Sequence, residues 1–315
     1  MILVNFDLNF VNLFMTLPGG IAQGILWGIM ALGLYITFRL LDVADLSVDG
    51  TFTLGGAVCV MLITNGMNPW LAILIAFISG ILAGTVTGVL HTKLGIPAIL
   101  AGILTQFSLY SINLAIMTFK SNIAVSVDKY QVILSSRYIP LSILFGFILA
   151  CILICLMYWY FGTENGSAMR ATGCNPEMAK AQGININTMK MIGLALSNGI
   201  VAFSGGLMAQ YQGFSDIKMG QGAIVIGLAS IIIGEVICNG LFKKATNFAL
   251  KLFFIVIGGI LYYFVIVIVL WLKLDPNLLK LFTAIIVTIF LAVPNMQELS
   301  KSSFRRAGKN SMKEI

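Results

Sequence analysis

The sequence predicts an all-α, polytopic membrane protein with about eight to ten transmembrane helices, because long apolar runs fill a chain that carries few charges. Of its 315 residues, 59% are hydrophobic and only 10% are charged, and the mean hydropathy is +0.98. Soluble domains are about 45–50% apolar and about 25% charged. The composition therefore excludes a soluble enzyme, and at roughly 20 apolar residues per span little of the chain is left for a soluble domain.

Nine apolar runs follow one another along the chain. They are Gly20–Phe38, Thr51–Ile63, Trp70–Leu90, Ile96–Thr118, Leu141–Phe161, Thr188–Ala209, Gly222–Ile237, Phe248–Leu272 and Leu278–Val293. The second and the seventh are shorter than a full span and contain Gly and polar residues. Such segments are typical of the broken helices that line a pathway in transporters, although a thin, tilted helix is an equally good interpretation.

The basic residues predict the orientation of these runs. With the C-terminal tail inside, the cytosolic side holds 13 basic residues: Arg39, Lys93, Arg170, Lys180, Lys190, Lys243, Lys244, Lys251, Lys301, Arg305, Arg306, Lys309 and Lys313. The outer side holds six: Lys120, Lys129, Arg137, Lys218, Lys273 and Lys280. The positive-inside rule favours this orientation. Nine runs place the N-terminus outside, whereas a span over residues 2–17 or a re-entrant short run places it inside.

Several classes of site are not expected in this chain. The net charge of +7 comes from short loops and the tail, which indicates membrane orientation and no nucleic-acid partner. The cysteines form no C-x-x-C or Cys/His pattern, and His91 is the only histidine, so we expect neither a metal site nor a disulfide framework. The first residues lack the basic region and cleavage site of a signal peptide, so the spans themselves are expected to direct insertion.

The longest inner loop, Glu164–Asn187, contains the signals of a short helix. Asn175 is the expected N-cap, Pro176 the first helical residue, and Gly183 the stop. A helix of about two turns between two spans must lie roughly parallel to the membrane. It suits contact with a cytosolic partner, and an ordinary connecting loop is the alternative.

The stretch Gly166–Ile184 resembles the coupling segment of bacterial ABC-transporter permeases, in the family of branched-chain amino-acid and ribose-type sugar permeases. The family pattern is matched at Arg170, Ala171, Gly173, Asn175, Pro176, Ala179, Gly183 and Ile184. Upstream, Asp45–Gly56 resembles the Asp-Leu-Ser-Val-Gly segment of the sugar permeases, with Asp49 interrupting the pattern. The resemblance covers roughly residues 20–295.

This resemblance implies a type II ABC importer-like permease in the bacterial cytoplasmic membrane. Residues 1–19 then form an N-terminal segment, 20–295 the permease domain with a coupling loop at 164–188, and 296–315 a basic cytosolic tail. The implied partners are a second permease copy, cytosolic ATPase subunits, an extracellular solute-binding protein and membrane lipids. The chain has no G-x-x-x-x-G-K-[ST] phosphate loop, so it is expected to be no enzyme and to hold no cofactor, with ATP and magnesium on the ATPase. Arg170 and Lys180 are expected to pair with acidic groups there, or else with solvent or lipid phosphate.

Polar groups inside a bilayer are costly and face a cavity or another helix. The candidates are Asp49, Gln106, Asn113, Asn198, Gln221 and Glu235, and all of these except Gln221 are expected to line the translocation pathway. Gln106 and Asn113 fall on one helix face, which suits a pathway lining or hydrogen bonding between helices.

Glu235 has cations only beyond its span, at Lys243 or Lys244, and acts either in a gate or in dimer packing. Tyr110, Phe107 and Trp27 are candidates to stack on an aromatic substrate, and the glycine pairs 55–56 and 205–206 are expected to allow close packing.

The sequence therefore predicts the membrane subunit of an ABC importer that moves a small organic solute by alternating access. Gly234-Glu235 resembles the branch of the family linked to tryptophan-like substrates, which implies an amino acid and, more narrowly, an aromatic one. Sugars and nucleosides remain alternatives, since related permeases handle them. An ion-coupled secondary transporter is the rival class, and only Asp49 and Glu235 could provide its coupling site within the runs.

Overall fold

The structure is a computed structural model that describes residues 10–126, 129–242 and 247–271, together with four positions between 281 and 288. The expected run Leu278–Val293 lies almost wholly outside the described residues, and the tail 296–315 lies outside them. The elements, in chain order, are α1 (Phe10–Tyr35), the π-helix η1 (Ile36–Leu40), α2 (Val48–Thr64), α3 (Pro69–Thr92), α4 (Ala98–Ile116), β1 (Asn122–Ala124), α5 (Ile139–Gly162), α6 (Glu164–Cys174), α7 (Pro176–Ala181), α8 (Ile186–Gln212), β2 (Phe214–Asp216), α9 (Ala223–Leu241) and α10 (Phe248–Trp271).

Within the described residues, seven helices are long and apolar enough to cross a membrane, and α2 is a shorter apolar helix. This confirms the predicted all-α, polytopic fold, although the first helix begins at Phe10 rather than at Gly20. The spans of α1 and α8 are 83% and 78% buried inside the fold, whereas that of α5 is 22% buried. The exposed side chains of α5 are apolar, as Trp159 and Leu144 illustrate. Helices α1 and α8 therefore form the centre, and α5 presents an outer surface suited to lipid or to another apolar helix.

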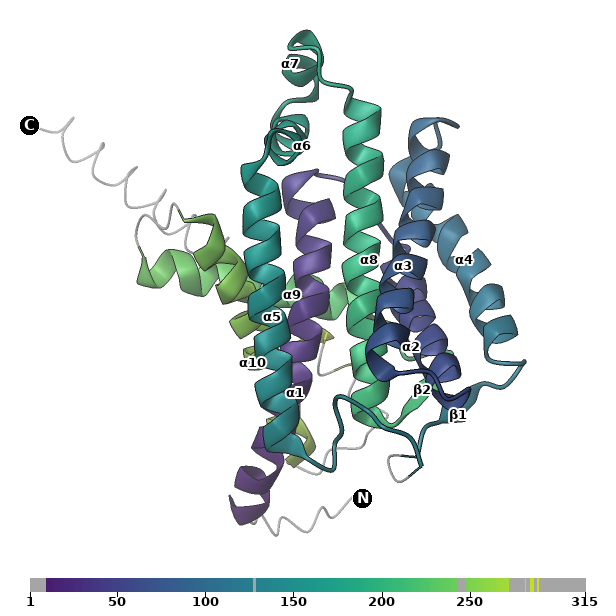
Figure 1. Cartoon of the computed structure of the whole chain (residues 1–315). Coiled ribbons are helices and arrows are strands. Elements are labelled where there is room, and N and C mark those ends of the chain that lie inside the picture. The colour runs from purple at the N-terminus through teal and green to yellow at the C-terminus, as the bar shows by residue number, and fades with distance from the viewer. Residues whose placement is uncertain are drawn as a thin grey trace, which may run out of the picture.

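The two ends of the molecule carry different elements (Figure 1). Helices α6 and α7 lie at one end, and strands β1 and β2 lie at the other. The strands pair antiparallel, with Asn122 opposite Asp216. The loop between α3 and α4, which contains Lys93, lies at the α6–α7 end. Lys120 just precedes β1 and Lys218 just follows β2, so these two lysines belong to the strand end, as the charge distribution predicts. Helix α1 begins at the strand end, as the interpretation with nine runs requires.

The first long helix is broken before α2. A π-turn ends it, in which the Leu41 amide donates to the Ile36 carbonyl over 3.1 Å, and residues 41–47 then run back into the fold without helical structure. Apart from the exposed Asp42, this segment is packed inside the protein: Val43 is 5% exposed and Asp45 is 0% exposed. Non-helical backbone at membrane depth is tolerated only where protein or a cavity surrounds it. The short run Thr51–Ile63 forms most of α2, which directly follows this break. The structure therefore agrees with the broken-helix interpretation of this run.

A buried polar cluster fixes this broken segment to α8. The Asn198 amide donates to Asp45 Oδ2 over 2.7 Å and to the Leu194 carbonyl over 3.0 Å. Asp45 Oδ1 accepts from the Ser47 amide over 2.9 Å and from the Ser47 hydroxyl over 2.6 Å. Asp45, Ser47 and Asn198 are all 0% exposed. Because buried polar groups need partners, the cluster specifies one position of the segment against α8.

Glycines bring α2 and α8 into backbone contact. A Cβ atom at Gly55 would meet the backbone of Ala202, and one at Gly205 would meet the backbone of Phe52. The expected packing role of the two glycine pairs is therefore confirmed. Next to this crossing, the Trp27 ring of α1 stacks on Phe52 with 4.7 Å between ring centroids.

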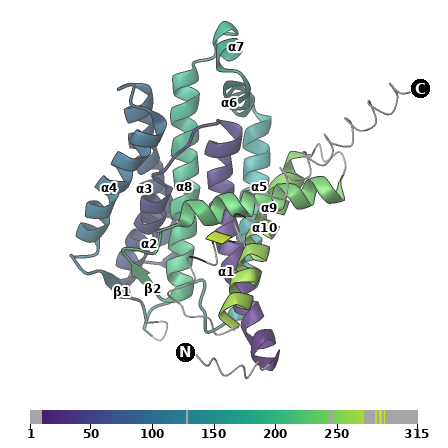
Figure 2. The same cartoon turned by 180° about the vertical axis from the view of Figure 1, so that it is seen from behind.

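Helix α9 is oriented differently from the other long helices. The seventh expected run forms this helix, and its length and apolarity would allow it to cross a membrane. Figure 2 shows it lying across the direction of α1 and α8 rather than parallel to them. It begins after Gly222, whose φ of 87° allows the chain to turn sharply out of the preceding loop.

The crossing of α2 and α8 yields a stability prediction. We expect Gly205→Ala to lower the free energy of unfolding by about 1–3 kcal/mol, because the added methyl group forces two backbones apart. Thermal unfolding of the detergent-solubilised protein measures this. Gly162→Ala is the control, since no heavy atom lies within 4 Å of its Cβ position. Equal midpoints for the two variants would contradict the packing assignment.

The buried cluster yields a second prediction. Asn198→Leu removes the donor to Asp45 Oδ2, so we expect a loss of about 1–3 kcal/mol from the unsatisfied buried acceptor. The same thermal assay measures it. Asn187→Leu provides a matched control, because this asparagine lies exposed on the same helix. A variant at position 198 that unfolds with the control would show that the cluster does not anchor the segment.

Candidate functional site

The first candidate site is the helix pair α6–α7 at one end of the molecule (Figure 1). The predicted short helix is confirmed as α7: Asn175 Oδ1 accepts from the Met178 amide over 3.1 Å, Pro176 is the first helical residue, and Gly183 has a φ of 81°. Helix α6 was not predicted. Its signals are the Thr163 hydroxyl, which caps the Gly166 amide over 3.4 Å, and Glu164 in its first turn.

Several residues of the coupling pattern determine how the two short helices sit. A Cβ atom at Gly173 would meet the Leu40 backbone, so α6 packs directly on the end of η1. Ala179 is 3% exposed, and its carbonyl accepts from the Ile184 amide over 3.0 Å after the turn at Gly183. Small residues and a left-handed turn are thus required here for packing.

The outer side of the pair is open. A cleft of about 660 Å³ lies between α6 and α7, and its lining includes Ala171, Asn175, Met178 and Ile184. Met178 is 62% exposed although it is apolar. Arg170 and Lys180 are exposed, and neither forms an ion pair with the described residues. The pair therefore offers an apolar cleft with cations beside it.

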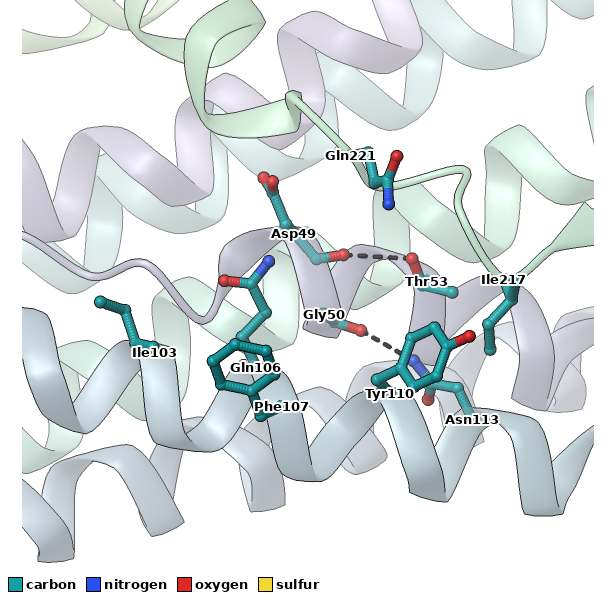
Figure 3. A pocket seen from close by; sticks show the side chains of 10 residues that line it. All are labelled: Asp49, Gly50, Thr53, Ile103, Gln106, Phe107, Tyr110, Asn113, Ile217 and Gln221. Carbon is teal, nitrogen blue, oxygen red and sulfur yellow. Dashed lines mark hydrogen bonds between the residues drawn. The ribbon is translucent and has the colours of Figure 1, made fainter.

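The second candidate site is a cavity of about 460 Å³ between α2, α4 and the loop before α9 (Figure 3). Its lining consists of Asp49, Gly50, Thr53, Ile103, Gln106, Phe107, Tyr110, Asn113, Ile217 and Gln221. Three of the polar residues expected along the pathway, Asp49, Gln106 and Asn113, thus lie together. The cavity combines one carboxylate, three amides and two aromatic rings, and such a set can bind a small polar solute with an apolar part.

Asp49 connects the cavity to α9. Its Oδ2 accepts from the Gly222 amide over 3.0 Å, and its Oδ1 accepts from the Ile224 amide over 3.1 Å. The Thr53 hydroxyl accepts from the Gly220 amide over 3.2 Å in the same loop. Asp49 therefore occupies the positive N-terminus of α9, where a carboxylate is stabilised.

The other expected pathway residues lie elsewhere. Asn198 belongs to the buried cluster with Asp45 and does not line the cavity. Glu235 forms an ion pair with Arg39 at the end of η1. The expectation that its cations lie only beyond the span, at Lys243 or Lys244, is therefore wrong. The two partners are 196 positions apart, so the only available sequence signal was a lone cation at the end of the first run.

The three aromatic candidates separate into two groups. Phe107 and Tyr110 line the cavity and are 72% and 49% exposed. Trp27 is 5% exposed and packs between Phe52 and Tyr263, so it belongs to the core. Only the first two rings can meet a solute in the cavity.

Comparisons with known proteins identify the family of the chain. The profile of the family described as "Branched-chain amino acid transport system / permease component" matches residues 16–294. A tyrosine transport system permease protein of Clostridioides difficile is 41% identical over 295 residues, covering 93% of this chain and 97% of the relative. An uncharacterised protein of Rickettsia prowazekii is 35% identical over 86% of this chain and 94% of its own length.

More distant relatives transport other solutes. A nucleoside ABC transporter permease protein of Lactococcus lactis is 25% identical over 76% of this chain and 75% of its own length. No solved structure matches the chain. The profile match, the relatives and the apolar helices lead to one conclusion: the chain belongs to the family of branched-chain amino acid transport system permease components and is a multi-pass transport protein of the bacterial cell membrane.

Proposed function

We propose that the chain is the membrane-spanning subunit of an ATP-driven ABC importer that moves an aromatic amino acid into the cell by alternating access. The observation that carries this proposal is the capped helix pair α6–α7, whose apolar cleft and exposed cations Arg170 and Lys180 lie at one end of the molecule. The substrate follows from the tyrosine transport relative, which is 41% identical over almost the whole chain. The fructose and nucleoside permeases are only 26% and 25% identical.

The partners follow from the same site. An ATPase subunit that carries ATP and magnesium would dock on the α6–α7 cleft, with Ala171, Asn175 and Ile184 in its lining and Arg170 beside acidic groups of the ATPase. Gly173, Pro176, Ala179 and Gly183 would hold the shape of the docking helix. Two copies of the chain would enclose the pathway within the lipid bilayer, and an extracellular solute-binding protein would deliver the substrate at the strand end.

A continuous series of contacts supports transmission of the ATPase movement. Helix α7 packs on α6, and α6 packs through Gly173 on Leu40. Leu40 leads directly into the broken segment 41–47, and that segment leads to Asp49 at the cavity. Because close-packed elements transmit a displacement instead of absorbing it, a push on α7 would reach the residues that line the cavity.

Reconstitution tests the proposed function. The chain, its ATPase and its binding protein are placed in proteoliposomes, and uptake of labelled tyrosine is measured. We expect uptake that requires ATP and persists without an ion gradient. Uptake driven by a sodium or proton gradient without ATP would support the secondary-transporter alternative. ATP-driven uptake of ribose or a nucleoside, but not of tyrosine, would retain the importer and overturn the substrate.

The coupling assignment predicts a selective defect. Asn175→Ala combined with Gly183→Pro removes the cap of α7 and the left-handed turn after it, which proline cannot adopt. We expect ATP hydrolysis to continue while substrate-stimulated transport falls by about tenfold or more, the change that 1.4 kcal/mol of lost coupling would give. Gly95→Pro is the control, because Gly95 also has a positive φ (69°) in another loop at this end. Wild-type transport by the double variant would disprove the assignment.

The Arg39–Glu235 pair predicts a gating defect. Because the Arg39 side chain is 53% exposed, neutralising one partner should change stability by less than about 1 kcal/mol. We expect Glu235→Gln to slow turnover severalfold, and the exchange Arg39→Glu with Glu235→Arg to restore it. Turnover is followed as transport per ATPase complex, and folding by thermal unfolding. Unchanged turnover with a weakened dimer would instead assign Glu235 to dimer packing.

A further inference from the structure

The cavity between α2 and α4 is lined by a negatively charged group, which a site for a neutral sugar or an anion does not need. Its lining includes the carboxylate of Asp49 and the amides of Gln106, Asn113 and Gln221, and no lysine, arginine or histidine is among the described residues that line it. A solute that enters therefore meets one negative charge and several hydrogen-bonding groups. This combination favours a solute with a positively charged group and disfavours one with a net negative charge.

The carboxylate of Asp49 is held in place and still has capacity for a ligand. Its Oδ2 accepts from the amide of Gly222, the N-cap of α9, and its Oδ1 accepts from the amide of Ile224 in the first turn. An ionised carboxylate offers about four acceptor positions. Among the described residues, no lysine or arginine forms an ion pair with Asp49. The amides orient the carboxylate without neutralising it fully.

Asn113 provides a second, independent observation. Its Nδ2 donates to the Gly50 carbonyl over 3.1 Å, and because a carbonyl can only accept, this bond fixes which side of the amide carries the oxygen. Asn113 is 1% exposed, and its Oδ1 has no hydrogen-bond partner. A buried acceptor without a donor indicates a missing group. The cavity lining thus holds the carboxylate of Asp49 and one unsatisfied acceptor, the Oδ1 atom of Asn113, which is buried behind the lining surface.

We propose that this cavity recognises the ammonium group of an amino-acid substrate through Asp49, while the substrate's apolar part lies against Phe107 and Tyr110. The inference rests on the proposed function and deepens it, because it assigns the chemical feature by which the permease itself selects its solute. Neutral sugars and carboxylic acids without an amine lack that feature. Asp49 then acts in substrate recognition in addition to capping α9.

Protection from labelling tests the proposal. Gln221 lines the cavity and is exposed, so Gln221→Cys is introduced, and its reaction with a maleimide is measured by mass spectrometry of its peptide in the assembled transporter. The probes are tyrosine, tyramine without a carboxylate, and 3-(4-hydroxyphenyl)propionate without an amine. We expect tyrosine and tyramine to slow labelling and the propionate to have no effect. Equal protection by all three would overturn the proposal without any further variant.

Two variants separate recognition from helix capping. Asp49→Asn should weaken protection by tyrosine and tyramine about tenfold, as expected for one lost charge-assisted hydrogen bond. Asp216→Asn neutralises a carboxylate that accepts the Lys218 amide of the same loop over 2.7 Å. Asp216 is not among the residues that line the cavity, so this variant should preserve protection. Unchanged protection in Asp49→Asn, or an equal loss in both variants, would overturn the proposal.

Failure here is distinguishable from failure of the proposed function. ATP-driven tyrosine uptake in a transporter that neither tyrosine nor tyramine protects would leave the importer intact and overturn this inference. Protection by leucine that depends on Asp49, without protection by tyrosine, would retain the ammonium site and overturn the aromatic substrate. Protection by ribose that is independent of Asp49 would overturn both.

Discussion

The rest of the structure depends on how the chain satisfies its backbone where the first helix is broken. Inside a bilayer no water is available to pair with unwound backbone, so residues 41–47 are stable only because protein surrounds them. The cluster of Asp45, Ser47 and Asn198 supplies this environment from α8. The close approach of α2 and α8 at Gly55 and Gly205 holds the same two elements together further along. Without this anchor, α2 would have no fixed position, and the cavity beside it would have no fixed shape.

The same break lies between the two candidate sites. On one side, Leu40 supports α6 and, through it, α7. On the other side, Asp49 lies two residues after Ser47 and faces the cavity. If residues 36–64 formed one unbroken α-helix, that helix would move as a rigid rod. With a rise of about 1.5 Å per residue, it would also extend well past the cavity. The break permits a short path from the α6–α7 end of the protein to the residues that line the cavity.

Patterns of neighbouring residues predicted much of this fold, but such patterns carry no information about contacts between residues that are far apart in the sequence. The apolar runs and the cap of α7 at Asn175 depend on neighbouring residues, so the sequence contains them directly. Helix α6 was missed because Gly166 and Gly173 argue against a helix, whereas the fold needs them for close contact with Phe161 and Leu40. Likewise, the partners of Glu235 and Asn198 come from residues more than 150 positions away, and no periodicity reveals such a pairing.

Helix α9 is connected to both sides of the break, because a residue on each side of the break binds one part of this helix. Its N-terminus is bound by Asp49, just after the unwound segment, and Glu235 in its last turns is paired with Arg39, just before that segment. Both contacts connect α9 to residues 39–49, so we expect a displacement of that segment to move α9 as well. Because α9 runs across the bundle (Figure 2), it would carry such a displacement sideways, from the segment next to α6 to the wall of the cavity.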